Sequence, residues 1–508
     1  MIAKPFARVV RSPLLIIVFY TVFYLTSRLQ NLTSLPVFGD EAIYIRWSQI
    51  IKNVETLRFV PLTDGKQPLF MWIVAVFLKF SSDPLLAGRL VSVFAGLATS
   101  LIIFQTICYL INFSDPETNP LINLISTLKK NYFRASPVLL IYLFSPFFFF
   151  FDRLALADNL LSFFGSLSLL LSLLLARCRR LDLALILGFS LGFGLLTKSP
   201  ALYFVILTFV TYIIINRSAS FKTFYYPLVS SLVAFAMYSI LKLGPQFHQI
   251  ALRNRDYVYT LSEIITHPLD PLVPHLKDIF TLYGHFFSIY LILFFLAIIL
   301  LSVSRFRHRT ILVLLIWWLV PLLANASFAK SFTARYILFT TPPLIILIGY
   351  LASYFNYKVV LPLLFLLLPN VFTLYRLSTS PFTYKLPPTE TGYLQDWTSG
   401  WGIRDSASYL INRAKTHNVI VGTEGAFGTL PDGLQIYADG VKQLTIIGVG
   451  LGFTSLPPSL INAKNYGDDV YLLINQSRNN LSTAEQQKIT PIFRHPKPDN
   501  DFLILYQL

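Results

Sequence analysis

The chain has 508 residues, 55% of them apolar, with a formal net charge of +16 and a mean hydropathy of +0.61. A soluble core of this size cannot bury so much apolar sequence, so the composition excludes a soluble globular protein and predicts a polytopic membrane protein. The two cysteines, Cys108 and Cys178, predict no disulfide framework.

The first apolar run extends from about Pro13 to about Thr26 and has no small-residue cleavage site behind it. We therefore expect a retained helix and not a removed signal peptide. Ten further runs follow, so the fold class is a polytopic α-helical membrane protein with about 11 transmembrane helices, some of them tilted or broken. These runs lie near 84–112, 135–151, 159–176, 183–197, 200–215, 226–243, 284–304, 310–324, 336–355 and 359–375.

Basic residues in alternate loops predict the orientation, because cytoplasmic loops are enriched in Lys and Arg. With a cytoplasmic N-terminus, the first loop (28–83), the loop 244–283 and the chain beyond about Arg376 are extracytoplasmic. We expect a multi-pass protein of a bacterial plasma membrane. The residues that fall on the inner side are Lys4, Arg8, Arg11, Lys129, Lys130, Arg134, Arg177, Arg179, Arg180, Arg217, Lys222, Arg305, Arg307, Arg309 and Lys358.

An acidic pair, Asp40 and Glu41, follows the first apolar run. A carboxylate at the centre of a bilayer costs roughly 2.5–3.5 kcal/mol, so acids in so apolar a chain are expected where water or a polar ligand meets them. The pair marks a candidate active site on the outer face. The competing interpretation is that Asp40 caps a helix that begins near Ile43, a role that Asp fills well.

Cationic residues also gather in the predicted outer segments. Any one of them could extend towards lipid headgroups. Several on the same side as an acidic pair favour a shared phosphate site, with Lys as a point charge and Arg as a planar fork. These residues are Arg28, Arg46, Lys52, Arg58, Lys66, Arg89, Arg153, Lys198, Arg253, Arg255, Lys330 and Arg335.

The tail has a different composition, and we expect two domains, a transmembrane domain over 1–386 and a soluble extracytoplasmic domain over 387–508. A helix-like run from Arg404 to about His417 alternates with strand-like runs at 419–421, 444–447, 470–474 and 502–505. This alternation predicts a small α/β domain. The glycine-rich segment 448–452 follows a strand, but prolines stand where a dinucleotide-binding helix would begin, so we exclude that site.

Six short motifs fall on the predicted outer face. They are Gly39-Asp40-Glu41, Lys66-Gln67-Pro68, Gly88-Arg89-Leu90, Asp152-Arg153 through Asp158, Thr197-Lys198-Ser199-Pro200 and Ala334-Arg335-Tyr336. Together they resemble the motifs of C-type glycosyltransferases that use polyprenyl-phosphate sugars. The similarity is to the protein O-mannosyltransferases and lipid A aminoarabinose transferases, a glycosyltransferase family 39-like group, and it covers roughly 1–376. In the second motif, Gln67 stands where the family usually has the first of two prolines.

The resemblance implies transfer of a sugar, mannose-like or related, from a polyprenyl-phosphate donor to an acceptor hydroxyl, with inversion at the anomeric carbon. The acceptor is a protein, lipid or glycan. A positioned carboxylate activates the hydroxyl and cations neutralise the phosphate. We assign Asp40 as the base and Glu41 as a residue that shapes the site. The expected substrate-binding residues are Lys66, Arg89, Arg153, Asp158, Lys198, Arg335 and Tyr336.

The alternative functions are a lipid-linked saccharide transporter or flippase and a surface-polysaccharide ligase. Transporters usually show internal repeats and ionisable residues at the midplane, and neither is evident here. No nucleic-acid partner is expected. No metal site is assigned, because the four histidines in or beside the loop 244–283 match no metal-binding spacing, although a divalent metal stays an alternative.

Overall fold

The computed structural model describes residues 13–111, 132–216, 221–302 and 309–508. The predicted inner residues Lys4, Arg8, Arg11, Lys129, Lys130, Arg217, Arg305 and Arg307 lie outside these ranges. The chain forms two compact units. The first comprises Met1–Gln30, Pro61–Phe70 and Val91–Tyr375, and the second comprises Asn31–Val60, Met71–Leu90 and Arg376–Leu508. The second unit thus includes most of the first predicted outer loop, in addition to the predicted tail domain.

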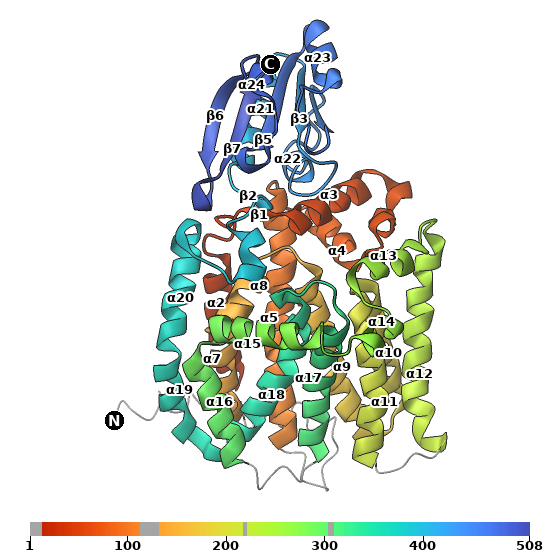
Figure 1. Cartoon of the computed structure of the whole chain (residues 1–508). Helices are drawn as coiled ribbons and strands as arrows, with labels where there is room; N and C mark the ends of the chain where they lie inside the picture. Colours follow the sequence, from red (N-terminus) through yellow and green to blue (C-terminus); the bar gives the residue numbers. More distant parts are fainter. Residues whose placement is uncertain (1–12, 112–131, 217–220, 303–308) are drawn as a thin grey trace. The chain divides into compact units, whose positions relative to one another are not determined.

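The first unit is helical (Figure 1). Helix α10 packs against α9 and α12, and α11 packs against α9 and α17. The helices are α2 (Pro13–Leu29), α5 (Pro84–Ile111), α7 (Pro137–Leu143), α8 (Pro146–Asp152), α9 (Ala157–Cys178), α10 (Leu181–Thr197), α11 (Leu202–Asn216), α12 (Phe221–Tyr238), α13 (Gln249–Tyr257), α14 (Leu261–Thr266), α15 (Leu272–Phe287), α16 (Ile289–Leu301), α17 (Arg309–Phe328), α18 (Thr341–Ala352), α19 (Val360–Leu366) and α20 (Leu368–Thr379). The first residues of α5 and the last of α20 belong to the second unit.

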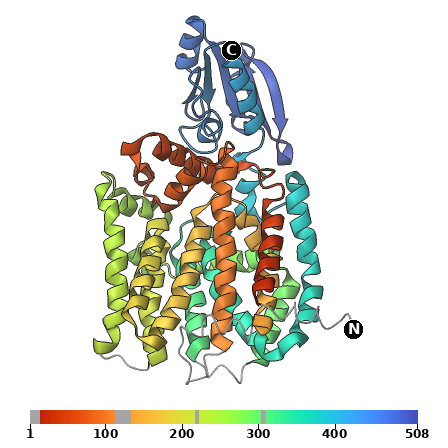
Figure 2. The same cartoon turned by 180° about the vertical axis from the view of Figure 1, so that it is seen from behind.

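Polar contacts fix some helices inside this apolar unit. Figure 2 shows α2, in red, beside the orange α5, and the Tyr24 hydroxyl donates to the Val93 carbonyl over 3.1 Å. The same hydroxyl lies 2.8 Å from a carboxylate oxygen of Asp152, which is itself 3.5 Å from the Arg28 guanidinium. All these polar side chains are buried. They pair with one another because an unpaired charge in an apolar interior is costly.

The apolar runs predicted from the sequence all correspond to helices. Six helices among the described residues are long and apolar enough to cross a membrane, and three bent pairs would raise the number to nine. Two shorter apolar helices, α2 and α10, complete the set. The chain is therefore a multi-pass membrane protein, while the count of 11 spans stays a prediction.

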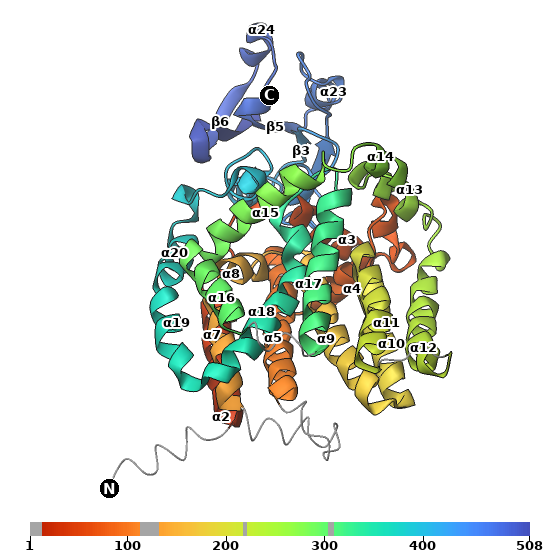
Figure 3. The ribbon, with the colours of Figure 1, turned by 60° about the horizontal axis from the view of Figure 1, so that its bottom comes forward.

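One predicted outer loop contains more regular structure than expected. Within 244–283 the chain forms α13, α14 and most of α15, and α15 meets α16 at an angle of 104°. Figure 3 shows α16 turning away from α15. The bend falls at Ser288, whose φ is 59° and whose hydroxyl caps α16. Only the second half of this bent pair matches the apolar run predicted over 284–304.

The second unit contains the predicted α/β domain, built on a five-stranded sheet in the order β4-β3-β5-β7-β6. β3 pairs in parallel with β4 and β5, and β7 pairs antiparallel with β5 and β6. The other elements of this unit are β1, α3, β2 and four helices. Their bounds are β1 (Val37–Phe38), α3 (Gly39–Asn53), β2 (Ser399–Gly400), α21 (Ile403–Arg413), β3 (Val419–Thr423), α22 (Asp432–Gln435), β4 (Leu444–Gly448), α23 (Pro458–Asn465), β5 (Asp469–Asn475), α24 (Thr483–Gln486), β6 (Thr490–Pro496) and β7 (Phe502–Gln507), while α4 (Leu69–Phe77) joins the two units in sequence.

One hydrophobic cluster of this domain lies on one face of the sheet. Leu460 of α23 packs there with Val470, Leu472 and Ile474 of β5. These three alternate residues share one face because side chains alternate along a strand. The central position of β5 explains its nearly unbroken apolar sequence.

The first and last parts of the chain meet within the second unit. β1 pairs antiparallel with β2, in the register Val37 with Gly400 and Phe38 with Ser399. A Cβ atom at Gly400 would lie 2.6 Å from the Val37 carbonyl oxygen, so this pairing requires glycine there. On the other side of α3, the Gln49 side-chain amide donates to the Ile436 carbonyl over 2.7 Å. The loop that carries the acidic pair is thus part of the α/β unit.

The predicted orientation can be tested with cysteine labels at exposed positions. In a background without Cys108 and Cys178, Thr56→Cys and Ser408→Cys should both react with an impermeant maleimide in intact cells, because both residues belong to the predicted outer segments. Arg180→Cys should react only after the membrane is opened. Protection of Thr56→Cys in intact cells would contradict the orientation.

Candidate active site

The acidic pair lies in the first turn of α3, directly after β1. Phe38 occupies the N-cap position, and its backbone N–H donates to the Glu41 carboxylate over 3.0 Å. Carboxylates are favoured in a first helical turn, where the helix dipole is positive. Because α3 begins at Gly39, Asp40 lies inside the helix. The competing interpretation of Asp40 as the cap of a helix from Ile43 therefore does not describe this turn.

Glu41 forms a buried ion pair with Arg89, and neither side chain is exposed. Arg89 Nε donates to one carboxylate oxygen over 2.9 Å and Nη2 donates to the other over 2.8 Å. The remaining donors reach the carbonyls of Leu32, Leu35 and Pro36 over 2.8, 3.0 and 2.9 Å. The five N–H groups of the guanidinium are thus all used. We assign Arg89 to fixing this loop, in place of the phosphate contact expected from the sequence.

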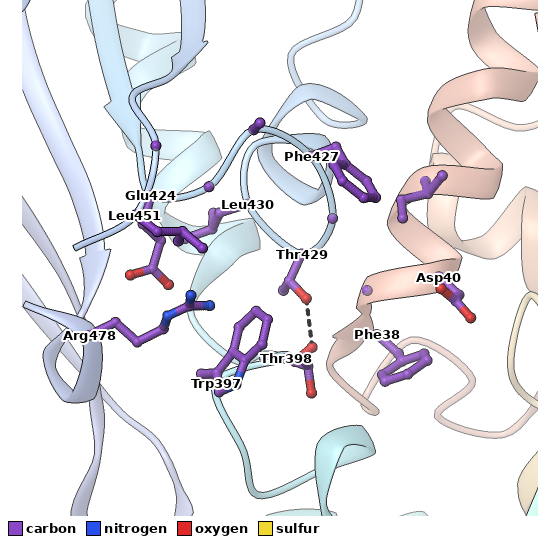
Figure 4. A pocket seen from close by; sticks show the side chains of 16 residues that line it. Phe38, Asp40, Trp397, Thr398, Glu424, Phe427, Thr429, Leu430, Leu451 and Arg478 are labelled. Carbon is purple, nitrogen blue, oxygen red and sulfur yellow. Dashed lines mark hydrogen bonds between the residues drawn. The ribbon is translucent and has the colours of Figure 1, made fainter. Parts of the chain in front are cut away.

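Asp40 lines a cavity of about 590 Å³ within the second unit (Figure 4). One wall consists of Phe38, Gly39, Asp40 and Ile43, and the other of loops from the α/β domain. Gly39 lies close to that second wall, because a Cβ atom there would be 3.1 Å from Thr429 Oγ1. The cavity has the size of a small-molecule site. Of the predicted site residues, only Asp40 lines it.

Four other predicted residues come together in the first unit. Asp158, in the first turn of α9, accepts a hydrogen bond of 2.6 Å from the Lys198 ammonium, at the end of α10. The same ammonium lies 5.0 Å from the centre of the Tyr336 ring, and the Arg335 guanidinium lies 5.5 Å from that ring. Two cations, one carboxylate and one phenol thus form a polar cluster, which we call the Lys198 cluster.

Lys66 is linked to this cluster through its sequence neighbour Gln67. The Gln67 side-chain amide donates to the Ser199 hydroxyl over 2.7 Å, next to Lys198. The Lys66 ammonium lies 4.6 Å from the centre of the Tyr257 ring. Gln67, which replaces the proline usual in the related motif, therefore joins the Lys66 segment to the Lys198 cluster.

Arg153 differs from the other predicted cations, because it is fully buried. Its guanidinium lies 4.8 Å from the centre of the Phe149 ring and donates to the Gln30 carbonyl over 3.1 Å. These contacts hold α8 against the end of α2. They favour a structural role for Arg153 over the substrate contact expected from the sequence.

No group of three or more His, Cys, Asp or Glu side chains that could hold a metal ion occurs within the described ranges. Sequence reasoning also missed the cavity residues of the α/β domain, including Trp397, Glu424 and Arg478. For Glu424 and Arg478 the available signal was their position shortly after predicted strands, since the loops at strand ends of such sheets commonly bind ligands. Trp397 precedes all the predicted strands and offered no such signal.

Breaking the Arg89–Glu41 pair should destabilise the protein. Glu41→Gln should lower the free energy of unfolding by about 3–5 kcal/mol, because it leaves the buried guanidinium without a counter-charge. Denaturation of the purified protein in detergent measures the change. Arg404→Ala is the matched control, since it removes an exposed ion pair with Asp83 in the same unit and should cost no more than about 1 kcal/mol. Equal effects of the two substitutions would contradict the assignment.

Comparisons with known proteins support the resemblance seen in the sequence. The family model "Dolichyl-phosphate-mannose-protein mannosyltransferase" matches residues 121–241. No curated protein sequence matches the chain. Two crystal structures of ArnT from Cupriavidus metallidurans, one in the apo state and one bound to undecaprenyl phosphate, each align over 97% of both chains, with a TM-score of 0.55 and 13% sequence identity.

The structural alignment covers both the helical part and the C-terminal α/β domain, while the family match falls in the helical part. The likeness predicted from the outer-face motifs is thus confirmed at the level of fold and family resemblance. The chain has the fold of the C-type membrane glycosyltransferases and resembles glycosyltransferase family 39.

Proposed function

We propose that this protein transfers a sugar from a polyprenyl-phosphate donor to an acceptor hydroxyl at the outer face of the membrane. The observation that carries the proposal is the position of Asp40 at the wall of a cavity, in a chain with the C-type glycosyltransferase fold. Its neighbour Glu41 is occupied by Arg89. Because Asp40 lines the cavity and Glu41 is buried in an ion pair, we assign the role of base to Asp40.

In the proposed reaction, Asp40 accepts the proton of the acceptor hydroxyl as its oxygen attacks the anomeric carbon. The bond between that carbon and the phosphate oxygen breaks, and polyprenyl phosphate leaves with the bonding electrons. One displacement of this kind inverts the anomeric centre. General-base help is worth about 10²–10⁴ in rate. Glu41 and Arg89 hold the helix turn that carries Asp40.

The Lys198 cluster and Lys66 are the proposed phosphate contacts. Charge at the leaving phosphate increases during transfer, and positioned cations stabilise it. Asp158 would keep the Lys198 ammonium in place and lower the net charge of the cluster, while Tyr336 would present its ring and hydroxyl. ArnT from Cupriavidus metallidurans has been solved with undecaprenyl phosphate bound, which favours this donor class for the present chain.

If Asp40 is the base, Asp40→Asn should lower the transfer rate by about 10²–10⁴, because an amide cannot accept the proton. Transfer from radiolabelled polyprenyl-phosphate sugars to a membrane extract measures the rate. Asp439→Asn serves as the control, since Asp439 also pairs with a residue of α3, over 3.0 Å to Arg46, but lies outside the cavity lining. An Asp40→Asn protein with normal turnover would end the assignment of Asp40.

If the Lys198 cluster binds phosphate, Arg335→Lys should weaken undecaprenyl phosphate binding about tenfold, because the charge remains but the bidentate fork is lost. Lys66→Ala should have an effect of similar size through loss of a point charge. Binding to the purified protein is measured with a fluorescent polyprenyl phosphate. The exposed Lys277→Ala is the matched control in the same unit. Unchanged affinity in both the Arg335 and the Lys66 variant would favour the headgroup interpretation of these cations.

A further inference from the structure

The second wall of the cavity is formed at one edge of the α/β sheet. Residues 424–430 follow β3, Gly450 and Leu451 follow β4, and Arg478 follows β5, all shortly after the carboxyl ends of these parallel strands. β3 lies between β4 and β5, although it precedes both in the chain. Ligands of open α/β sheets bind at this edge, where successive connections leave in opposite directions. The cavity therefore occupies the position in the sheet at which such domains bind ligands.

The loops at this edge are held by their main chains. The Gly425 N–H donates to the Gly450 carbonyl over 2.7 Å, and Gly450 returns a hydrogen bond of 3.3 Å. Both glycines have positive φ angles, 82° and 89°, which other residues rarely adopt. The Gly428 N–H donates over 2.6 Å to the carboxylate of Asp432, whose pKa is raised by burial. The glycine-rich segment 448–452, which does not fit a dinucleotide-binding motif, thus forms one of these two loops.

A buried polar network supports the carboxylate of Glu424. Its oxygens accept hydrogen bonds from the side chain and the backbone N–H of Asn475. The Lys497 ammonium donates to the Asn475 side-chain oxygen over 2.8 Å and to the Trp397 carbonyl over 3.2 Å. Burial lowers the pKa of Lys497 to about 8, and nearby carboxylates oppose that shift. Glu424 is only 4% exposed and is therefore fixed at the cavity wall. Glu424, Asn475 and Lys497 stand at the ends of β3, β5 and β6.

Two aromatic side chains, Trp397 and Phe427, and the guanidinium of Arg478 complete the second wall. The Arg478 guanidinium lies 3.9 Å from the centre of the Trp397 ring, and Figure 4 shows both beside Glu424, across from Asp40 and Phe38. Trp397 is 40% exposed and Phe427 61% exposed. A pyranose ring has an apolar face of C–H groups and a rim of hydroxyls. Aromatic rings can stack on the C–H face, and a fixed carboxylate and a guanidinium can hydrogen-bond with the hydroxyls.

The charge of the cavity distinguishes it from the Lys198 cluster. Its charged lining residues are Asp40, Glu424 and Arg478, so carboxylates outnumber cations. A phosphate would meet net repulsion there, whereas a neutral or amino-bearing sugar would not. The lining thus favours a neutral or amino-bearing sugar over the lipid-phosphate part of a donor.

We infer that this cavity binds a saccharide ring of the acceptor, stacked on Trp397 or Phe427 and hydrogen-bonded by Glu424 and Arg478. The inference rests on the proposed function only for the role of Asp40 as the base. It makes the acceptor a glycan or glycolipid, and it makes the α/β domain the element that selects it. Glu424 and Arg478 become specificity-determining residues that bind without taking part in bond cleavage.

Binding of fluorescent oligosaccharides to the purified full chain in detergent tests this inference without requiring transfer. The probes are neutral, amino-bearing and phosphorylated hexose oligomers and one Ser/Thr-rich peptide. Neutral or amino-bearing probes should bind, and Trp397→Ala and Glu424→Gln should each weaken binding about tenfold. Phe427→Ala provides a second aromatic variant whose exposed side chain contributes little to folding. Tyr466→Ala, at an 88% exposed aromatic residue of the same domain, is the matched control.

Several outcomes would overturn the inference: no saccharide binding, tightest binding of the phosphorylated or peptide probe, or equal binding by the cavity variants and Tyr466→Ala. The proposed function is tested separately by Asp40→Asn. If that variant transfers normally while binding still depends on Trp397 and Glu424, the proposed base is wrong and the saccharide site stands. If transfer requires Asp40 but the cavity variants bind saccharide as the wild type does, only the further inference fails.

Discussion

The Arg89–Glu41 ion pair is the contact on which the candidate site depends. A buried ion pair contributes little net stability, because desolvation offsets much of its attraction. Here the guanidinium also binds three carbonyls of residues 32–36, so one side chain fixes the approach to α3, the helix start and the carboxylate beside Asp40. Losing either partner would leave a charge or several carbonyls unsatisfied. The pair therefore fixes the backbone of the loop that lies between α2 and α3 in the sequence.

The charged residues singled out from the sequence serve different purposes. Glu41, Arg89 and Arg153 are fully buried and engaged with main-chain groups or rings, which suits them to positioning. Asp40 and the Lys198 cluster belong to different units, and in the proposed reaction they supply the base and the phosphate site. Within the cluster, Asp158 offsets part of the positive charge. A bound phosphate would therefore be attracted less strongly than by the cations alone, and its release would be easier.

Sequence reasoning was most successful where a pattern is local. Every predicted apolar run forms a helix, and the four predicted strands of the α/β domain are present, because hydrophobic periodicity depends on near neighbours. It missed β6, whose Pro491 and Pro496 argue against a strand, although an edge strand tolerates proline. Sequence reasoning did not recognise that Arg89, unlike the cations of the Lys198 cluster, has a structural role. Its five hydrogen-bond acceptors are brought to it only by the folded chain. The cavity could not be predicted either, because its walls combine residues 38–43 with residues 397–478.

The pairing of β1 with β2 has a consequence for the order of biogenesis. Val37 is synthesised early, but its partner Gly400 follows only after most of the chain has been made. At about 5–20 residues per second, translation alone separates the two by roughly 20–70 s. During that interval the segment with the acidic pair lacks its strand partner and the loops of the α/β domain. The candidate site would therefore form only as the last domain folds, after the membrane helices have been synthesised.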